Sequence, residues 1–285
     1  MSNEPDSAPN SAQIDYWNAA AGQTWAEYQE QLDRQIEPLG QEAMRVLAPA
    51  PGEHILDIGC GCGQTTLALA ARVGPQGAIV GVDISAPMLD VARRRALSQP
   101  NVSIAFKELD AQVGALGAEV FDAAFSRFGV MFFSDPAAAF SNIHRSLQPG
   151  GRLTFVCWRP MQQNEWMRAP LEAAQPFLPP SAPADPLAPG PFAFADADRV
   201  RALLLAAGFD SVRVDPFDAL IGAGSFDESL NLAFKVGPLG AALREHPECK
   251  DQVVSAVSDV LARHVTPAGV RMHSAVWIFL ARKRR

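Results

Sequence analysis

The sequence is poor in several features that mark particular classes of protein. It has four cysteines in 285 residues, too few and too scattered for the disulfide framework of a short secreted domain. Its longest apolar runs, such as "SAVWIFLA" at residues 274–281, fall well short of the roughly 18 to 20 residues that cross a bilayer. The opening "MSNEPDSAPNSAQ" lacks the basic start and apolar stretch of a signal peptide. We therefore expect a cytoplasmic protein without a membrane helix.

Clustered positive charge is also scarce. The chain has 24 Lys and Arg residues against 31 Asp and Glu residues, and a net charge of −7. Its dense basic groups are Arg93 to Arg95 and the tail "ARKRR", which we interpret as solvated surface. Phosphate binding needs larger clusters of Lys and Arg, so we expect no nucleic-acid partner. The 48% hydrophobic content is that of an ordinary globular protein with a core.

Short runs of β-formers alternate with helical patterns from residue 53 onward. Ser85 is placed to cap a helix over 86–97, and Asp135 with Pro136 opens one that continues to 147. The predicted strands are 54–58, 78–84, 103–109, 120–126 and 152–158. Strand and helix repeated in this order predict parallel strands with right-handed crossovers, and therefore a doubly wound α/β sheet.

The segments around this core have other compositions. Residues 1–50 are predicted to be helical in two pieces, and the Pro-rich residues 160–191 to form a long loop or cap. Asp196 is a plausible N-cap for a helix that ends at Gly208. A strand over 211–217, a helical insertion at about 226–264 and an apolar strand over 273–283 complete the chain. The predicted units are an N-terminal helical lid (1–50), a core (51–160), a Pro-rich cap segment (161–195) and the C-terminal part of the sheet (196–285).

The stretch "LDIGCGCGQTT", residues 56–66, admits two interpretations. Cys60 and Cys62 could bind a metal, but C-x-C needs further ligands and no His or Cys pair stands nearby. A glycine-rich turn between a strand and a helix instead lets the backbone approach a ligand at the carboxyl end of the sheet. Asp83 closes the next strand, where a carboxylate can accept hydrogen bonds from both ribose hydroxyls of a nucleotide. The residues thus favour a ligand that contains ribose.

A dinucleotide is the first such ligand to consider. Its G-x-G-x-x-G signature would place glycine at position 64, where this chain has Gln64. A short-chain dehydrogenase would also need a Tyr and Lys pair near the fifth strand, whereas the chain has only Tyr16 and Tyr28. An NAD(P)-dependent oxidoreductase is therefore the weaker alternative.

Five motifs in register carry a family resemblance. They are "LDIGCGCG", "VGVDISAPML", "LDAQ", "FDAAFSRFGVMFF" and "LQPGGRLTFVCW". Together they resemble the class I S-adenosylmethionine (SAM)-dependent methyltransferases, especially the branch related to ubiquinone and menaquinone C-methyltransferases. The resemblance covers roughly residues 50–160. It implies a Rossmann-like sheet of seven strands with the last one antiparallel, helical and Pro-rich cap insertions, SAM as cofactor and S-adenosylhomocysteine (SAH) as product.

The resemblance also implies roles for particular residues. The Gly59 and Gly61 backbone would pass the amino-acid end of SAM, with Asp57 near its ammonium group. Asp83 would hold the ribose, Ile84 and Met88 would flank adenine, and Asp110 with Ala111 would meet its amino edge. Ser126 and Arg127 would lie by the methionine portion, and Tyr16 and Trp25 would belong to the lid.

The predicted acceptor side is apolar. The resemblance places Phe128, Met131, Phe132 and Trp158 there, although the same side chains would suit a plain core. Methyl transfer from SAM is an in-line displacement, so positioning the acceptor and excluding water can supply much of the catalysis. We therefore expect methylation of a small, largely apolar molecule and assign no catalytic residue. A SAM-binding protein without transferase activity and a homodimer both remain open.

The glycine interpretation predicts that Cys60 and Cys62 bind no metal. The purified protein should therefore contain no stoichiometric zinc by elemental analysis. Zinc at one equivalent that is lost in Cys60→Ser or Cys62→Ser would contradict this interpretation.

Overall fold

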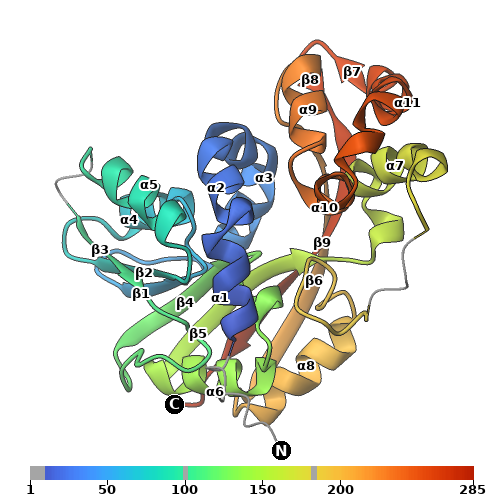
Figure 1. Cartoon of the computed structure of the whole chain (residues 1–285). Helices are drawn as coiled ribbons and strands as arrows, with labels where there is room; N and C mark the ends of the chain where they lie inside the picture. Colours follow the sequence, from blue (N-terminus) through green and yellow to red (C-terminus); the bar gives the residue numbers. More distant parts are fainter. Residues whose placement is uncertain (1–9, 99–101, 181–184) are drawn as a thin grey trace, which may run out of the picture.

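One seven-stranded sheet forms the centre of the molecule (Figure 1). The structure is a computed structural model and describes residues 10–98, 102–180 and 185–285. The strand order is β3-β2-β1-β4-β5-β9-β6. Its members are β1 (His54–Ile58), β2 (Ala78–Asp83), β3 (Ser103–Glu108), β4 (Phe121–Arg127), β5 (Leu147–Trp158), β6 (Ser211–Ile221) and β9 (Met272–Arg282). Neighbours among β1 to β5 are parallel, and β9 runs antiparallel to β5 and β6. The expected doubly wound sheet with an antiparallel last strand is confirmed.

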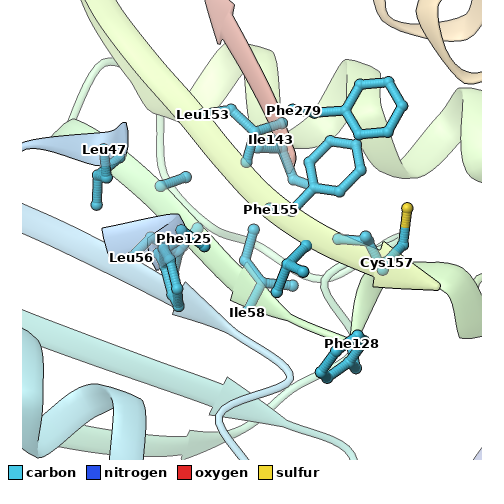
Figure 2. Close-up of a cluster of buried hydrophobic side chains, with 14 of the residues drawn as sticks. Leu47, Leu56, Ile58, Phe125, Phe128, Ile143, Leu153, Phe155, Cys157 and Phe279 are labelled. Carbon is cyan, nitrogen blue, oxygen red and sulfur yellow. The ribbon is translucent and has the colours of Figure 1, made fainter. Parts of the chain in front are cut away.

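Helices cover both faces of this sheet. Figure 1 shows α4 (Gln64–Val73) and α5 (Ala86–Ala96) above it, and α6 (Pro136–Ser146) and α8 (Ala197–Ala206) below it. The core between these layers is rich in phenylalanine. Phe155 of β5 stacks on Phe279 of β9 at 4.7 Å between ring centroids, as Figure 2 shows. The predicted N-caps Asp135 and Asp196 each accept hydrogen bonds from the first turn of their helix.

Two strands are longer than the sequence indicated. β6 continues to Ile221 and contains Pro216. Proline lacks an N–H for the ladder, but β6 is an edge strand, so one side of it needs no partner. β5 begins at Leu147 instead of the predicted residue 152, and its register with β4 shifts between Phe121 and Ala123.

Within residues 10–50, the part of the N-terminal segment that the structure describes, there are three helices where two pieces were expected. They are α1 (Ser11–Asn18), α2 (Ala20–Glu27) and α3 (Gln29–Leu47). The chain breaks at Ala19, whose backbone is extended (φ −89°, ψ −151°). α3 buries Leu39, Ala43 and Leu47 and packs on β4, β5, β6 and β9. The amphipathic pattern of its sequence therefore reflects a face packed on the sheet.

The Pro-rich segment is a loop only in part. Residues 165–174 form α7 (Glu165–Ala174), so the loop alternative is wrong there, whereas the cap alternative stays a prediction. Pro170 lies inside this helix, and the other prolines of the segment flank it at Pro160 and from Pro176 onward. α7 packs with the insertion helices α9 (Phe226–Ala233), α10 (Gly237–Glu245) and α11 (Lys250–Ala262) around a second apolar cluster. The β7–β8 pair (Val265–Thr266 and Gly269–Val270) follows α11. Within the described ranges, no helix is both long and apolar enough to cross a membrane.

A buried carboxylate ties β1 to α4. Asp57 has no exposed surface, and its Oδ2 accepts hydrogen bonds from the hydroxyls of Thr65 at 2.7 Å and Thr66 at 2.6 Å. Its Oδ1 has no hydrogen-bond partner among the described residues. Burial raises the pKa of Asp57 to about 6, although the two threonine hydroxyls favour the ionised form.

Two glycines bring the ends of β1 and β4 into backbone contact. A Cβ added to Gly59 would lie 2.8 Å from the Cα of Gly129, and one added to Gly129 would lie 2.9 Å from the Cα of Gly59. Such distances are too short for real side chains, so both positions require glycine. This contact fixes the distance between the turns that follow the two central strands.

We predict that Gly129→Ala destabilises the protein by about 1–3 kcal/mol, because the methyl group overpacks this contact. Gly129 has an ordinary right-handed backbone (φ −83°, ψ −43°), so conformational strain adds nothing. Gly190→Ala is the matched control, since its Cβ would meet only the Ala188 carbonyl oxygen at 3.8 Å. Urea unfolding of both variants measures the difference; equal midpoints would contradict the prediction.

The raised pKa of Asp57 predicts a pH-dependent contribution to stability. The folded state holds the proton more tightly than the unfolded chain, whose pKa is 3.8. The contribution is therefore complete below pH 3.8 and is lost as the pH rises through about 6. Relative to Asp57→Asn, the wild type should lose about 1.4 kcal/mol of unfolding free energy between roughly pH 5 and pH 8. A difference that stays constant over this range would show that Asp57 does not titrate there.

Candidate functional site

A cavity of about 450 Å³ lies at the carboxyl ends of the central strands. One wall comes from the ends of β1 to β4 and the turns after them, and another from the N-terminal helices. The remaining wall comes from Trp158 and from segments after it, including α7, Phe192 and the start of α10. Most of the lining is apolar. The cavity therefore lies between two parts of the molecule. One is the edge at which doubly wound sheets bind ligands, and the other is a cover made from distant parts of the chain.

The glycine-rich turn after β1 forms part of the cavity floor. Gly59, Gly61 and Gly63 have φ values of +64°, +53° and +84°, a region that suits glycine. Gly61 also lies against α5, because a Cβ there would be 2.7 Å from the Cε of Met88. The turn thus depends on glycine both for its backbone shape and for its packing.

Asp83 stands at the end of β2, facing this turn. Its Oδ2 accepts a hydrogen bond from the Gly61 N–H at 2.8 Å, and its Oδ1 accepts one from the Ser85 N–H at 2.9 Å. Burial raises the pKa of Asp83, although these backbone donors oppose the change. The next residues Ile84 and Met88 also line the cavity. The carboxylate is therefore held in one orientation at the cavity wall.

Asp110 presents an unpartnered oxygen beside the same cavity. Its Oδ1 accepts a hydrogen bond from the Gln112 N–H at 2.9 Å, whereas its buried Oδ2 has no partner among the described residues. Asp110 and Ala111 both line the cavity. The Asn142 side chain fixes this loop by donating to the Ala111 carbonyl at 2.9 Å. Sequence reasoning missed Asn142, because its place in α6 does not reveal its contact with the loop.

The aromatic and apolar residues predicted for the acceptor side do line the cavity. They are Phe128, Met131, Phe132 and Trp158. Phe128 has φ +62°, an unusual value for a bulky residue, and its ring stacks on Trp158 at 4.1 Å with an interplanar angle of 9°. Figure 2 shows Phe128 beyond the end of β4, separate from the phenylalanines inside the core. The strained turn therefore turns this ring toward the cavity.

Arg127 is anchored on the side of the N-terminal helices. Its guanidinium donates to Gln64 and forms an ion pair with Asp33 at 3.3 Å. Its stem packs so closely under α3 that a Cβ on Gly40 would lie 2.9 Å from the Arg127 Cδ. Burial lowers the pKa of Arg127, and the Asp33 charge opposes this effect. Arg127 lines the cavity and also joins β4 to α3.

Three of the predicted cofactor residues do not line the cavity: Asp57, Gly61 and Ser126. Asp57 lies beneath the turn that follows β1. Gly61 contributes to the site through the hydrogen bond that its N–H donates to the Asp83 carboxylate. Ser126 accepts a hydrogen bond from the Gly129 N–H at 3.2 Å. Direct contact between these three residues and a cofactor stays a prediction.

The N-terminal helices cover the cavity and attach to the β2–α5 turn. Tyr16 and Trp25 line the cavity as expected, but Trp17 between them was missed. Its ring packs edge-on against Phe132 at 5.0 Å, and its carbonyl accepts a hydrogen bond from the Ser85 hydroxyl at 2.7 Å. The expected capping by the Ser85 side chain is thus wrong, since that hydroxyl points to α1.

Asn18 supplies the cap from α1. Its Oδ1 accepts a hydrogen bond from the Ala86 N–H at 2.9 Å, and its Nδ2 donates to the Ile84 carbonyl at 2.8 Å. A residue far away in the sequence therefore caps α5 and holds α1 over Asp83.

The cysteines of the glycine turn are buried thiols. Desolvation raises the pKa of Cys60 well above its ordinary value and that of Cys62 to about 12, so neither is a reactive thiolate at neutral pH. In the described part of the chain, no three His, Cys, Asp or Glu residues are grouped as metal ligands would be. No histidine lines the cavity; His264, for example, lies 3.8 Å from Glu165.

Part of the chain matches a known family. Residues 55–151 match the model of a methyltransferase domain. Aklanonic acid methyltransferase DauC of Streptomyces sp. strain C5 is 33% identical over 42% of this chain and 54% of that protein. A demethylmenaquinone methyltransferase of Symbiobacterium thermophilum is 37% identical over 45% of each chain. The chain spans about half the length of these curated relatives.

Solved structures share the fold over most of the chain. The YcgJ protein of Bacillus subtilis has a TM-score of 0.58 at 16% identity, covering 86% of this chain and 98% of that one. The [4+2]-cyclase SpnF has a TM-score of 0.54 at 20% identity, covering 87% and 81%. The five motifs, the strand order and the family match agree. Residues 55–151 are therefore similar to a methyltransferase domain, and the sheet around them has the fold of the structural neighbours.

Proposed function

We propose that this protein transfers a methyl group from SAM to a small, largely apolar molecule. The observation that carries the proposal is a single cavity that joins two unlike ends. One end has the carboxylates of Asp83 and Asp110, and the other has the stacked rings of Phe128 and Trp158. A polar nucleoside and an apolar acceptor can therefore meet in one enclosed space.

The residues at the polar end fit SAM. The unpartnered Oδ2 of Asp110 is an acceptor suited to the adenine amino group, and Ile84 and Met88 offer apolar surface for the ring. Asp83 is oriented by two backbone donors, and each of its oxygens retains acceptor capacity for a ribose hydroxyl. The glycines after β1 leave room for close approach of the amino-acid portion.

Bound SAM supplies an activated methyl group on a positively charged sulfur. The chain's part is to hold the acceptor against this group and to exclude water. The rings of Trp17, Phe132 and Trp158 surround the cavity and suit this task. Burial keeps Cys157 a thiol by raising its pKa, and no histidine lines the cavity, so we assign no general base.

The fold alone does not decide between transfer and binding. A structural neighbour is described as a [4+2]-cyclase, so proteins of this shape perform other reactions. Formation of SAH during incubation with an acceptor separates a transferase from a SAM-binding protein without transfer. The oxidoreductase alternative loses support, because the chain carries a methyltransferase domain.

Other expectations stay predictions. They are the division into an N-terminal lid, a SAM-binding core, a Pro-rich cap and a C-terminal part, the cytoplasmic location, the homodimer and the absence of a nucleic-acid partner. The three bonds that join Trp17 and Asn18 to the β2–α5 turn support a lid role for α1 and α2.

The proposal predicts that Asp83→Ala weakens SAM binding about a hundredfold. Two charge-assisted hydrogen bonds to the ribose are lost, on the order of 3 kcal/mol. Isothermal titration with SAM measures the change. Asp90→Ala removes an exposed carboxylate from α5 and is the matched control; its affinity should match that of the wild type. A folded Asp83→Ala protein that binds SAM within about threefold of wild type would refute the assignment.

A further inference from the structure

Two cationic side chains stand at the opening of the main cavity. Lys235 lies in the connection between α9 and α10, and Arg244 lies in the last turn of α10. Both residues line the cavity and are exposed to solvent, as is Tyr16 of α1. These three residues therefore mark the place where the cavity meets the surrounding water.

Close packing of α10 brings the two cationic residues together. A Cβ added to Gly240 would lie 2.5 Å from the carbonyl carbon of Lys235, so α10 approaches this backbone more closely than a side chain would allow. Arg244 follows Gly240 by four residues and shares its face of the helix. Its Nη1 donates a hydrogen bond to the Lys235 carbonyl at 2.9 Å. The guanidinium is therefore held beside the backbone of Lys235.

Tyrosines of the N-terminal segment contact both cations. The Nη2 of Arg244 lies 3.5 Å from the Tyr16 hydroxyl, and the Nζ of Lys235 lies over the Tyr28 ring, 6.0 Å from its centroid. A hydroxyl and a ring orient a cation but carry no net negative charge. Among the described residues, no Asp or Glu forms an ion pair with Lys235 or Arg244. The opening therefore carries positive charge that the described chain leaves uncompensated.

The charged residues of the cavity lining are divided between its floor and its opening. Asp83 and Asp110 stand at the strand ends, and Arg127 is ion-paired with a residue of α3. Lys235 and Arg244 are the charged residues at the opening. Two of the five N–H groups of Arg244 are engaged, which leaves others free, and a guanidinium suits the paired oxygens of a carboxylate or phosphate. This pattern fits an acceptor with an apolar body and a negative group at its outer end.

We infer that the methyl acceptor carries an anionic oxygen group, a carboxylate or a phosphate, remote from the methylated atom, and that Lys235 and Arg244 bind this group at the opening. The inference rests on the proposed function, since it concerns the acceptor of the same cavity. It makes the two residues specificity-determining, because an acceptor with a positive group at that end would meet two like charges. An anion at the opening also keeps part of its hydration, which limits the cost of binding it.

Probes with one apolar body and different end groups test the inference. Equilibrium dialysis of the full-length protein with SAH at neutral pH gives the affinities of 4-phenylbutanoate, 4-phenylbutyl phosphate, 4-phenylbutan-1-ol and 4-phenylbutylamine. We expect at least one anion to bind about tenfold more tightly than the alcohol, and the amine to bind more weakly than the alcohol. The two anions together show whether the pair prefers carboxylate or phosphate. The preference should shrink between about 0.05 M and 0.5 M NaCl, because salt screens exposed charges.

Four variants locate the preference on the protein. Lys235→Met and Arg244→Met each remove one charge and keep an apolar stem, so each should reduce the anion-to-alcohol ratio at least about threefold. Lys250→Met and Arg263→Met are the matched controls, since both residues are exposed cations of the same helical insertion that do not line the cavity. These controls remove the same charge and should leave the ratio as in the wild type.

Several results would refute the inference. They are anions that bind no more tightly than the alcohol, a ratio that Lys235→Met and Arg244→Met leave unchanged, and failure of all four probes to bind. A loss of SAM affinity beyond about threefold in either variant would also refute it, because the pair would then hold the carboxylate of the cofactor. SAM titration of the wild type tests the proposed function separately. Absence of SAM binding there would refute that function even if the preference for anions were observed.

Discussion

The site depends on the contact between Gly59 and Gly129, where the turns after β1 and β4 meet backbone to backbone. On one side, the β1 turn continues to Gly61, whose N–H orients the Asp83 carboxylate. On the other side, the β4 turn holds Phe128 with positive φ and stacks its ring on Trp158. A side chain at either glycine would separate these turns and with them the two ends of the cavity.

The two ends have different origins in the chain. The polar end is built from the ends of β1, β2 and β3, and each of its carboxylates is held by nearby backbone N–H groups. The apolar end is assembled from the turn after β4, Trp158, α3, α7, Phe192 and α10, most of which are far apart in the sequence. The N-terminal helices join the two ends, because α1 is bonded to the β2–α5 turn while Trp17 packs on Phe132.

This difference explains what the sequence could and could not predict. The strands, the sheet class and the position of Asp83 follow local rules, because short stretches of sequence carry the alternating patterns and turn residues. Asp110 was predicted from the family resemblance alone. Trp17, Asn18 and Asn142 escaped prediction because each acts through contacts with residues far away in the chain. Ser85 shows the same limit. Its position predicted a helix cap, but its hydroxyl donates a hydrogen bond to the carbonyl of Trp17, which is far away in the sequence. The helix α7 was missed because proline was expected to exclude a helix throughout residues 160–191, although α7 contains Pro170.

The most direct test of the account is isothermal titration of the wild-type protein with SAM, with SAH and with NADH. The account predicts micromolar binding of both sulfur nucleotides and none of the dinucleotide, because Asp83 and Asp110 line the cavity beside the glycine-rich turn and residues 55–151 match the model of a methyltransferase domain. Binding of NADH without binding of SAM or SAH would contradict the central claim.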